Sequence, residues 1–420
     1  MLRFLVVALS VAAAPVSQAS QSPPAVTMER AVAAALARSP SREAALARLE
    51  AARRAERSAG TWLNPAIEVR AENWTFSSWP WVPSPAAGAP PGLDFFTVLS
   101  QPFELGGQRG ARVRIAQADR AAAEADLARA NRAVGMEAAR VFLDAVRSRE
   151  WLRALESNRD GLDTLLAAMT ARVREGYAAQ ADLAKFQAES ARVLTQVLRA
   201  RLELSRNLSL LGTLMQEPVP LRAEQLVEPA LGQPPAGEPS ALATRAVDAS
   251  PEVLAARARS LRAAEALSLE KARRVPDLNV AGGYKRTAGT DTAVAGVLMA
   301  IPLFDANKRA IALAAGDRAG SALEQAAVEA RARADALSVF EAANLLSERA
   351  ARIDEDLLRP AALVRTAARS AFREGATDIL VLVDAERVYV DASREAVQLK
   401  LDAIAAALEA RLLLGEEFVR

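Results

Sequence analysis

The residues from Gly107 to Glu175 decide the fold, and they read GQRGARVRIAQADRAAAEADLARANRAVGMEAARVFLDAVRSREWLRALESNRDGLDTLLAAMTARVRE. This stretch has no proline and consists mainly of the helix formers Ala, Arg, Glu and Leu, so it predicts one helix of roughly 65–70 residues. Near its end, apolar residues recur in steps of seven, four, three and four, which predicts a seam against a near-parallel neighbour: Leu155, Leu162, Leu166, Met169 and Val173. At about 1.5 Å per residue, the helix would be about 100 Å long. We therefore expect other helices to run alongside it.

Composition excludes several classes of function. The 420 residues include 53 basic and 51 acidic side chains, and the two signs are interspersed, which argues against a nucleic-acid partner. The chain has no histidine and no cysteine, which excludes thiol nucleophiles, histidine acid–base pairs and the usual zinc or copper ligands. No motif for carboxylate, Lys, Tyr or Ser catalysis is visible. We expect neither an enzyme nor a cofactor or resident metal.

The N-terminus is typical of a targeting segment. Arg3 precedes an apolar run from Phe4 to Ala14, and Ser17-Gln18-Ala19 offers small residues for cleavage. The alternative, a membrane anchor, would need a longer apolar run. We expect a signal peptide over residues 1–19 and an exported mature chain.

The mature chain predicts a helix from about Thr27, with Thr27 as N-cap, to Gly60. Alternating residues then predict a strand from Ala66 to Phe76, and a second strand is expected from Leu93 to Gln101, after a loop. Beyond the long helix we expect a turn at Arg174–Ala178, a helix from about Ala181 to Leu211 and a Pro-rich linker over 217–239.

The second half of the sequence repeats the first. Ser39-Pro40 recurs 211 residues later as Ser250-Pro251, and Arg174-Glu175-Gly176 recurs 199 residues later as Arg373-Glu374-Gly375. Between these points, the two expected strands of the second half are separated only by about Arg286 to Thr292. We expect two repeats, 20–216 and 240–420, each with the order helix, strand, strand, long helix, turn, helix.

The four expected strands cannot close a sheet within one chain, and open strand edges are not tolerated in lipid. A symmetric oligomer could pool them, and three copies would supply twelve strands. The sequence itself leaves two, three or four copies open.

The mature chain resembles the TolC family of outer-membrane efflux proteins, and within it the CzcC-like branch that serves metal-ion pumps. The resemblance rests on the duplicated plan, on the two Arg-Glu-Gly turns, and on motifs at the strand ends: Gln101-Pro102-Phe103-Glu104-Leu105-Gly106-Gly107 and Ile301-Pro302-Leu303-Phe304-Asp305. It implies a homotrimer whose 12-stranded β-barrel in the outer membrane of a Gram-negative bacterium continues as a periplasmic α-barrel. It also implies two partners, a periplasmic adaptor and an RND-type pump of the inner membrane.

The resemblance places adaptor docking at the two turns, whose residues are Arg174, Glu175, Gly176, Tyr177, Arg373, Glu374, Gly375, Ala376 and Thr377. The alternative is that these are turns without a partner. Each glycine should allow a tight reversal through positive φ or close backbone approach.

The resemblance also implies a pore gate of acidic residues just beyond the second turn. Asp384 occupies one such position, but Val381 stands where the other acid is expected, and Asp378 could substitute for it. The alternative is that Asp384 is a solvated helix residue.

Gly161 and Pro360 are equivalent under the 199-residue offset, and both weaken a helix. We expect them to bend the long helices towards the turns; the alternative is a tolerated defect.

The predicted function is therefore the passive exit duct of a tripartite efflux system, conducting metal cations. Two alternatives share this architecture, the exit duct of drug efflux and that of protein secretion. A periplasmic coiled-coil adaptor or scaffold is a third, but it leaves the two strand pairs unexplained.

Overall fold

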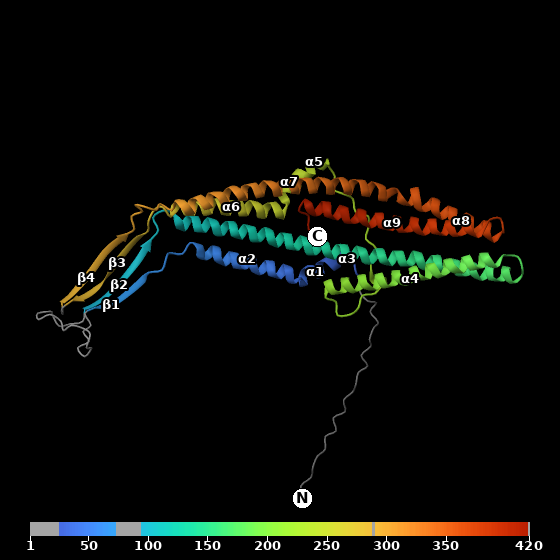
Figure 1. Cartoon of the computed structure of the whole chain (residues 1–420), viewed down its shortest axis with the longest axis horizontal. Helices are drawn as coiled ribbons and strands as arrows, with labels where there is room; N and C mark the ends of the chain where they lie inside the picture. Colours follow the sequence, from blue (N-terminus) through green and yellow to red (C-terminus); the bar gives the residue numbers. More distant parts are fainter. Residues whose placement is uncertain (1–24, 73–93, 288–289, 419–420) are drawn as a thin grey trace, which may run out of the picture.

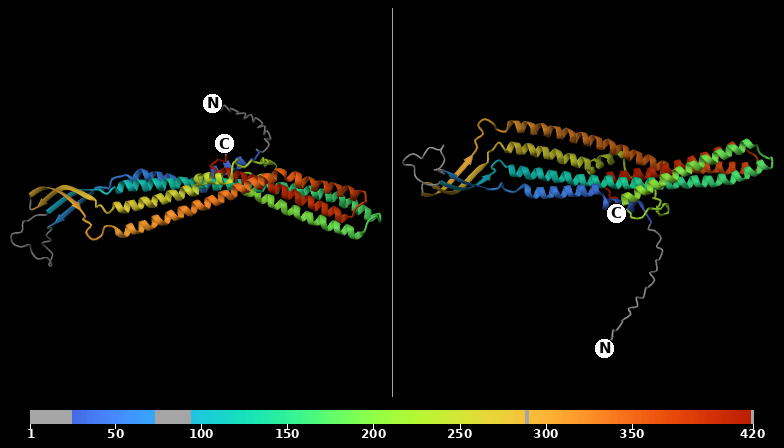
Figure 2. Two further views of the ribbon diagram at one scale, coloured as in Figure 1. Left: turned by 90° about the horizontal axis from the view of Figure 1, so that it is seen from above. Right: turned by 60° about the horizontal axis from the view of Figure 1, so that its bottom comes forward.

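A computed structural model describes residues 25–72, 94–287 and 290–418. The molecule is a long rod with a small sheet at one end and two helical hairpins at the other (Figures 1 and 2). The predicted signal peptide, the end of the predicted first strand and the loop up to Gly92 lie outside the described residues. The prediction of a mainly helical chain with two pairs of strands is confirmed.

The helices form four parallel lanes. Next to the sheet, the lanes are α2 (Pro40–Ala59), α3 (Gln108–Arg174), α6 (Pro251–Ala272) and α7 (Lys308–Ile353), packed in that order. Towards the other end, α4 (Gln180–Met215) replaces α2, α9 (Ile379–Leu413) replaces α6, and α8 (Arg359–Arg373) continues α7. The helix α3 therefore runs the length of the helical part (Figure 1). It packs against α2 and α4 on one side and against α6 and α9 on the other.

The predicted long helix is confirmed, because α3 has 67 residues without a break. Its seam differs by one residue from the prediction. Leu165 is buried at the position expected for Leu166, while Leu166 and Val173 are only partly buried at the edge of the cluster. The buried spacing then becomes regular, in steps of three and four, when Asn158 is included.

The first helix of each repeat is broken, which corrects the single helix expected from Thr27 to Gly60. The chain forms α1 (Met28–Arg38) and then α2, and the second repeat likewise forms α5 (Pro239–Ala249) and then α6. The break has a local cause. Ser39 and Ser250 act as N-caps, and the proline that follows each serine starts the next helix, where its missing N–H costs nothing.

The four strands form one antiparallel sheet in the order β1-β2-β3-β4. Their bounds are Ala66–Glu72, Asp94–Phe103, Leu278–Thr287 and Thr290–Met299. The second strand continues through Pro102, two residues past its predicted end. The connection predicted between Arg286 and Thr292 is also shorter, because β3 and β4 pair as far as Thr287 and Thr290.

The linker crosses the middle of the rod. It contains a short 3-10 helix, Ala223–Gln225, and Leu226 pairs with Val26 in an isolated parallel bridge. Both residues belong to an apolar cluster with Phe142 and Leu143 of α3 and Met215 of α4. The linker is therefore packed against the helices.

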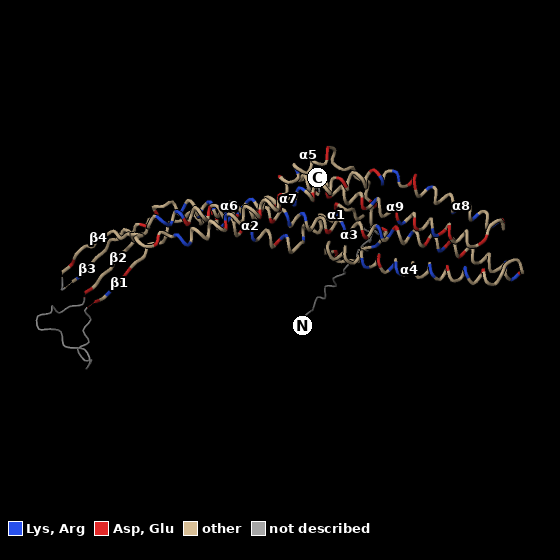
Figure 3. Tube along the Cα trace, turned by 45° about the horizontal axis from the view of Figure 1, so that its top comes forward, with Lys and Arg blue, Asp and Glu red and all other residues tan. Residues whose placement is uncertain are grey.

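Charges of both signs alternate along the helices (Figure 3). Several pair across lanes, as in Arg120–Glu56 between α3 and α2 and Arg262–Asp119 between α6 and α3. Such exposed pairs contribute little individually, so the helices are held mainly by their buried alanine and leucine side chains. None of the described helices has the length and apolarity needed to span a bilayer.

Candidate functional site

The two predicted turns have the same backbone structure. Gly176 has φ 83° and Gly375 has φ 74°, so both occupy the left-handed region that favours glycine. Around the first, the Tyr177 N–H donates to the Arg172 carbonyl (2.8 Å) and the Gly176 N–H donates to the Val173 carbonyl (3.1 Å). The second repeats this pair of bonds at Ala376 and Gly375. Each turn is thus a Schellman motif that stops its helix sharply.

The turns lie side by side at one end of the rod (Figure 1). Arg172 of α3 donates to the backbone carbonyls of Phe372 (3.3 Å) and Arg373 (2.8 Å) at the end of α8. Its guanidinium also lies 5.6 Å from the centre of the Phe372 ring. One arginine therefore fixes the spacing of the two turns, and sequence reasoning did not identify it.

The side chains of the turns point outward. Tyr177 is 81% exposed, and the predicted residues Arg174, Glu175, Arg373 and Glu374 are exposed as well. None of these four charged side chains forms an ion pair with a described residue. Ala376 is exposed and Thr377 partly buried. All nine predicted docking residues thus lie in the two neighbouring turns, and the four charged ones form no ion pair with a described residue.

The two candidate gate acids follow the second turn. Asp378 is the N-cap of α9, where its carboxylate accepts a hydrogen bond from the Ile379 N–H (2.6 Å). Asp384 lies six residues further along the same helix, is exposed, and makes no hydrogen bond to a described residue. The first acid therefore has a structural task, whereas the second is free to act on its surroundings.

Gly161 and Pro360 occupy different settings. The helix α3 continues regularly through Gly161, whose Cα faces Arg369 of α8 so closely that a Cβ would lie 2.5 Å from Nη2. Pro360, in contrast, follows a π-helical turn, η2 (Asp354–Leu358), that separates α7 from α8. The helix is therefore distorted before Pro360 but not at Gly161, and the glycine instead allows close packing.

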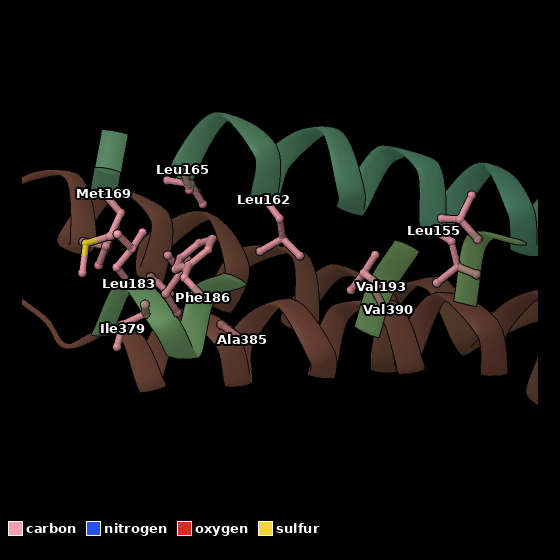
Figure 4. Packing of buried hydrophobic residues seen from close by; sticks show 14 of the residues in the cluster. Leu155, Leu162, Leu165, Met169, Leu183, Phe186, Val193, Ile379, Ala385 and Val390 are labelled. Carbon is pink, nitrogen blue, oxygen red and sulfur yellow. The ribbon is translucent and has the colours of Figure 1, made fainter. Parts of the chain in front are cut away.

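An apolar cluster supports the turns from behind (Figure 4). Leu162, Leu165 and Met169 of α3 point towards Leu183 and Phe186 of α4, with Ile379 and Ala385 of α9 beside them. Phe186 and Leu162 are almost completely buried. Removing such side chains from water is the main stabilising term for the hairpins.

Two buried carboxylates interrupt this apolar cluster. Glu386 of α9 is 2% exposed and forms a two-armed ion pair with Arg369 of α8, in which Nη2 donates to Oε2 over 2.9 Å. Glu189 of α4 accepts from Arg387 of α9 and from Arg192 (2.6 Å). The pair Glu189–Arg387 thus joins the first hairpin to the second.

Burial by itself would raise the pKa of Glu189, but hydrogen bonds from Arg387 and Arg192 outweigh it and lower the pKa. The signal that sequence reasoning missed is the position of both acids among apolar residues of their helices. Glu189 falls between Phe186 and Val193, and Glu386 falls between Leu382 and Val390.

The chain is similar in sequence and in fold to known proteins. Residues 31–215 match the family described as outer membrane efflux protein. This part of the chain belongs to the family. The chain is accordingly an efflux protein of the outer membrane and not an enzyme, which confirms the predicted family, outer-membrane location and class of function.

Similar sequences come from metal resistance. The nickel and cobalt resistance protein CnrC of Cupriavidus metallidurans is 29% identical over 305 residues, which cover 70% of this chain and 67% of CnrC. The cobalt-zinc-cadmium resistance protein CzcC of the same organism is 30% identical over 213 residues, half of each chain. The matched region thus spans between half and about two thirds of these relatives.

Solved structures share the fold at low identity. The outer membrane protein VceC of Vibrio cholerae superposes with a TM-score of 0.76 at 19% identity, covering 93% of this chain and 96% of VceC. The outer membrane channel CmeC of Campylobacter jejuni gives 0.76 at 14% identity, covering 99% and 96%.

Proposed function

We propose that three copies of this chain form one continuous exit duct for divalent metal cations. The observation that carries the proposal is the pair of open sheet edges. Strand β1 has a described neighbour only in β2, and β4 only in β3. An open edge cannot be left in lipid. Pairing β4 of one copy with β1 of the next would satisfy both edges and close the sheet.

The helical lanes are open on the same two sides. The outer lane formed by α4 exposes a row of leucines four residues apart, Leu194, Leu198 and Leu202. The opposite outer lane exposes Leu345 of α7 and Leu363 of α8, each at least 70% accessible. Exposed leucines on both edges of one layer are what a ring of helices needs, because each edge meets a different edge of the neighbour.

The choice of metal cations rests on the relatives named above, whose described roles are resistance to nickel, cobalt, zinc or cadmium. A passive duct needs no resident metal ligand, which is consistent with a chain without histidine and cysteine. Family membership implies an adaptor and a pump as partners. We infer that the pump is of the RND type and supplies the energy.

The exposed turns around Gly176 and Gly375 are the surface that we propose for the adaptor. Their uncommitted charges, Arg174, Glu175, Arg373 and Glu374, could each be neutralised by a partner. We also propose that Asp384, and with it Asp378, lines the pore constriction near the turns. Pro360 and its π turn would then set the bend of the second helix towards that constriction.

A resistance assay tests the function. The gene is deleted in its host, and growth is measured in Ni²⁺, Co²⁺, Zn²⁺ and Cd²⁺ and in a panel of hydrophobic drugs. We expect sensitivity to at least one metal and unchanged drug tolerance. Restored growth with the wild-type gene, but not with a Gly176→Val/Gly375→Val variant that still reaches the outer membrane, would support docking at the turns. Drug sensitivity without metal sensitivity would contradict the proposed cargo.

The constriction is tested separately by recording single channels in planar bilayers. Neutralising the acids as Asp378→Asn/Asp384→Asn should reduce cation preference and weaken block by multivalent cations, because a ring of like charges attracts counter-ions. Glu395→Gln, which removes an exposed acid further along α9, is the control. Equal selectivity and block in the wild type and the double variant would place the constriction elsewhere.

A further inference from the structure

A cavity of about 480 Å³ lies where the sheet meets the helices. The end of α2, the start of α3 and the end of α6 enclose it, together with the short segments that lead into the strands. Its polar lining includes Glu104, Gln108, Arg112, Arg273 and Asp277, and Trp62 forms part of its rim. The segments that line it lie at the opposite end of the helices from the two turns (Figure 1).

Gln108 is the most informative residue of this cavity, because its side chain is buried and only half satisfied. It is 5% exposed, and its Nε2 donates to the Val275 carbonyl and to Oδ1 of Asp277, both over 3.2 Å. These two acceptors fix the orientation of the amide, since the flipped amide would place oxygen against oxygen. The Oε1 atom is then buried without a donor among the described residues. A buried acceptor is unfavourable unless an N–H or O–H group reaches it.

The cavity presents charges of both signs. Arg273 is half exposed and holds Glu270 through Nη1 over 2.6 Å, which leaves its other nitrogen atoms available. Arg112 is paired with Glu104 and also donates to the Thr61 carbonyl (3.3 Å). Asp277 adds a carboxylate beside Gln108. Such a lining fits a ligand that carries both a phosphate and a positively charged donor.

Exposed apolar side chains mark this level of the molecule as the boundary of the lipid. Trp62 is 60% exposed, and Leu105 is also exposed. In the second repeat, the matching segment exposes Ile301, Leu303 and Phe304, the last of them almost completely. In membrane barrels, aromatic residues such as Trp62 and Phe304 lie at the level of the lipid head groups, and exposed aliphatic residues face the adjoining hydrocarbon. The cavity therefore opens where head groups of the periplasmic leaflet are available.

We propose that this cavity binds the phosphoethanolamine head group of a phospholipid in the periplasmic leaflet of the outer membrane. The phosphate lies against Arg273 and Arg112, and the ammonium group lies beside the Asp277 carboxylate. A small movement of the Gln108 side chain then lets the ammonium donate to Oε1, which has almost no exposed surface in the structure. The donor requirement selects the head group: ethanolamine carries N–H donors, whereas the choline of an otherwise identical lipid carries none.

The two lipids can be compared directly on the full-length protein. Purified protein is equilibrated with equal amounts of phosphatidylethanolamine and phosphatidylcholine of identical acyl chains, and the retained lipids are counted by native mass spectrometry. We expect about tenfold enrichment of phosphatidylethanolamine, the factor typical of one charge-assisted hydrogen bond. The preference should fall to about equal retention in Gln108→Met, which loses the acceptor, and the amount of bound lipid should fall in Arg273→Gln.

Two control variants share the chemistry without lining the cavity. Arg274→Gln removes the neighbouring exposed arginine, and Lys308→Met changes the residue equivalent to Gln108 in the second repeat. Both should keep the preference. Thermal unfolding shows which variants are folded, and if Gln108→Met is not, the exposed Arg273→Gln still decides.

Several outcomes would overturn the inference. Equal retention of the two lipids by the wild type would show that Gln108 does not accept a hydrogen bond from the ammonium group. Stronger retention of phosphatidylglycerol than of phosphatidylethanolamine would show recognition of negative charge alone. Binding of soluble glycerophosphoethanolamine with no retained phospholipid would show that the cavity does not open to the membrane.

Discussion

The turns of the two helical hairpins have the same backbone structure, but the side chains packed between the helices differ. Both end in the same glycine-centred motif, yet the second hairpin pairs a partly buried Arg369 with a buried Glu386, whereas the first has Thr170 and Gln187 at the positions 199 residues earlier. Thr170 bonds only within its own helix, to the Leu166 carbonyl (2.8 Å), and Gln187 is exposed. The two turns thus have the same backbone structure, but only the second hairpin has a buried ion pair between its own two helices. The buried Glu189 of the first hairpin pairs with Arg192 of its own helix and with Arg387 of the second hairpin.

Removing Glu386 should have the largest effect on this difference. Glu386→Gln leaves Arg369 partly buried without its counter-charge, and breaking such a pair costs about 3–5 kcal/mol. The equivalent change in the first hairpin, Gln187→Ala, should stay within about 0.5 kcal/mol because the residue is exposed. Hydrogen exchange of the α8/α9 hairpin and thermal unfolding measure both effects.

The apolar double variant Arg369→Met/Glu386→Leu is the matched control. Replacing a buried pair by apolar side chains of similar volume is often neutral or stabilising, so most of the lost stability should return. A double variant as unstable as Glu386→Gln would show that packing, and not the unpaired charge, causes the loss.

The stability that the Glu189–Arg387 ion pair contributes between the two hairpins should depend on pH. Because the pKa of Glu189 is lowered from its ordinary value of 4.5, the Glu189–Arg387 contribution is complete above that pH and declines as the pH falls through the lowered value. At pH 7, Glu189→Gln should cost about 1.5–3 kcal/mol, typical of hydrogen bonds to a charged group. Unfolding curves of both proteins should converge in acid.

Glu395→Gln on α9 provides the reference, because Glu395 is exposed and pairs with no described residue. Its unfolding curve should follow the wild type at every pH. A constant difference between wild type and Glu189→Gln down to pH 3 would show that the carboxylate is not what stabilises the bridge.

The smallest expected effect is that of Gly161→Ala on the free energy of unfolding. Its sign should differ between the wild type and a variant without the Arg369–Glu386 pair. In an ordinary helix, Gly→Ala stabilises by about 1 kcal/mol. Here the added Cβ would displace Arg369 from Glu386, so Gly161→Ala should destabilise the wild type by about 1 kcal/mol or more. In the Arg369→Met/Glu386→Leu background the substitution should instead stabilise, as thermal unfolding would show. A gain in both backgrounds would separate Gly161 from the ion pair.

The backbone could be predicted from sequence more fully than the interior of the hairpins. A proline-free run and two glycines at equal spacing predict α3 and both turns, because helix propensity and positive φ are local properties. The breaks at Pro40 and Pro251 were also encoded locally, by a serine cap before each proline. Glu386 and Glu189 were not recognised, because a single carboxylate among apolar residues indicates burial only when its arginine is known. Arg369 is 17 residues from Glu386 and Arg387 is 198 from Glu189.

The contact between β2 and β3 joins the two repeats within the sheet. At that contact, Gly283 faces Val98, and a Cβ at Gly283 would overlap the backbone of Thr97. If copies pair β4 with β1, the same kind of antiparallel contact occurs once inside each chain and once between chains, so a three-membered ring is geometrically close to a six-membered ring of half-length units. Six copies of a chain with a single repeat could have formed such a ring before two repeats were joined in one chain. The two halves differ at this position, because Glu72 of β1 stands 211 residues before Gly283, so only the second half has the glycine that lets β3 approach β2 closely.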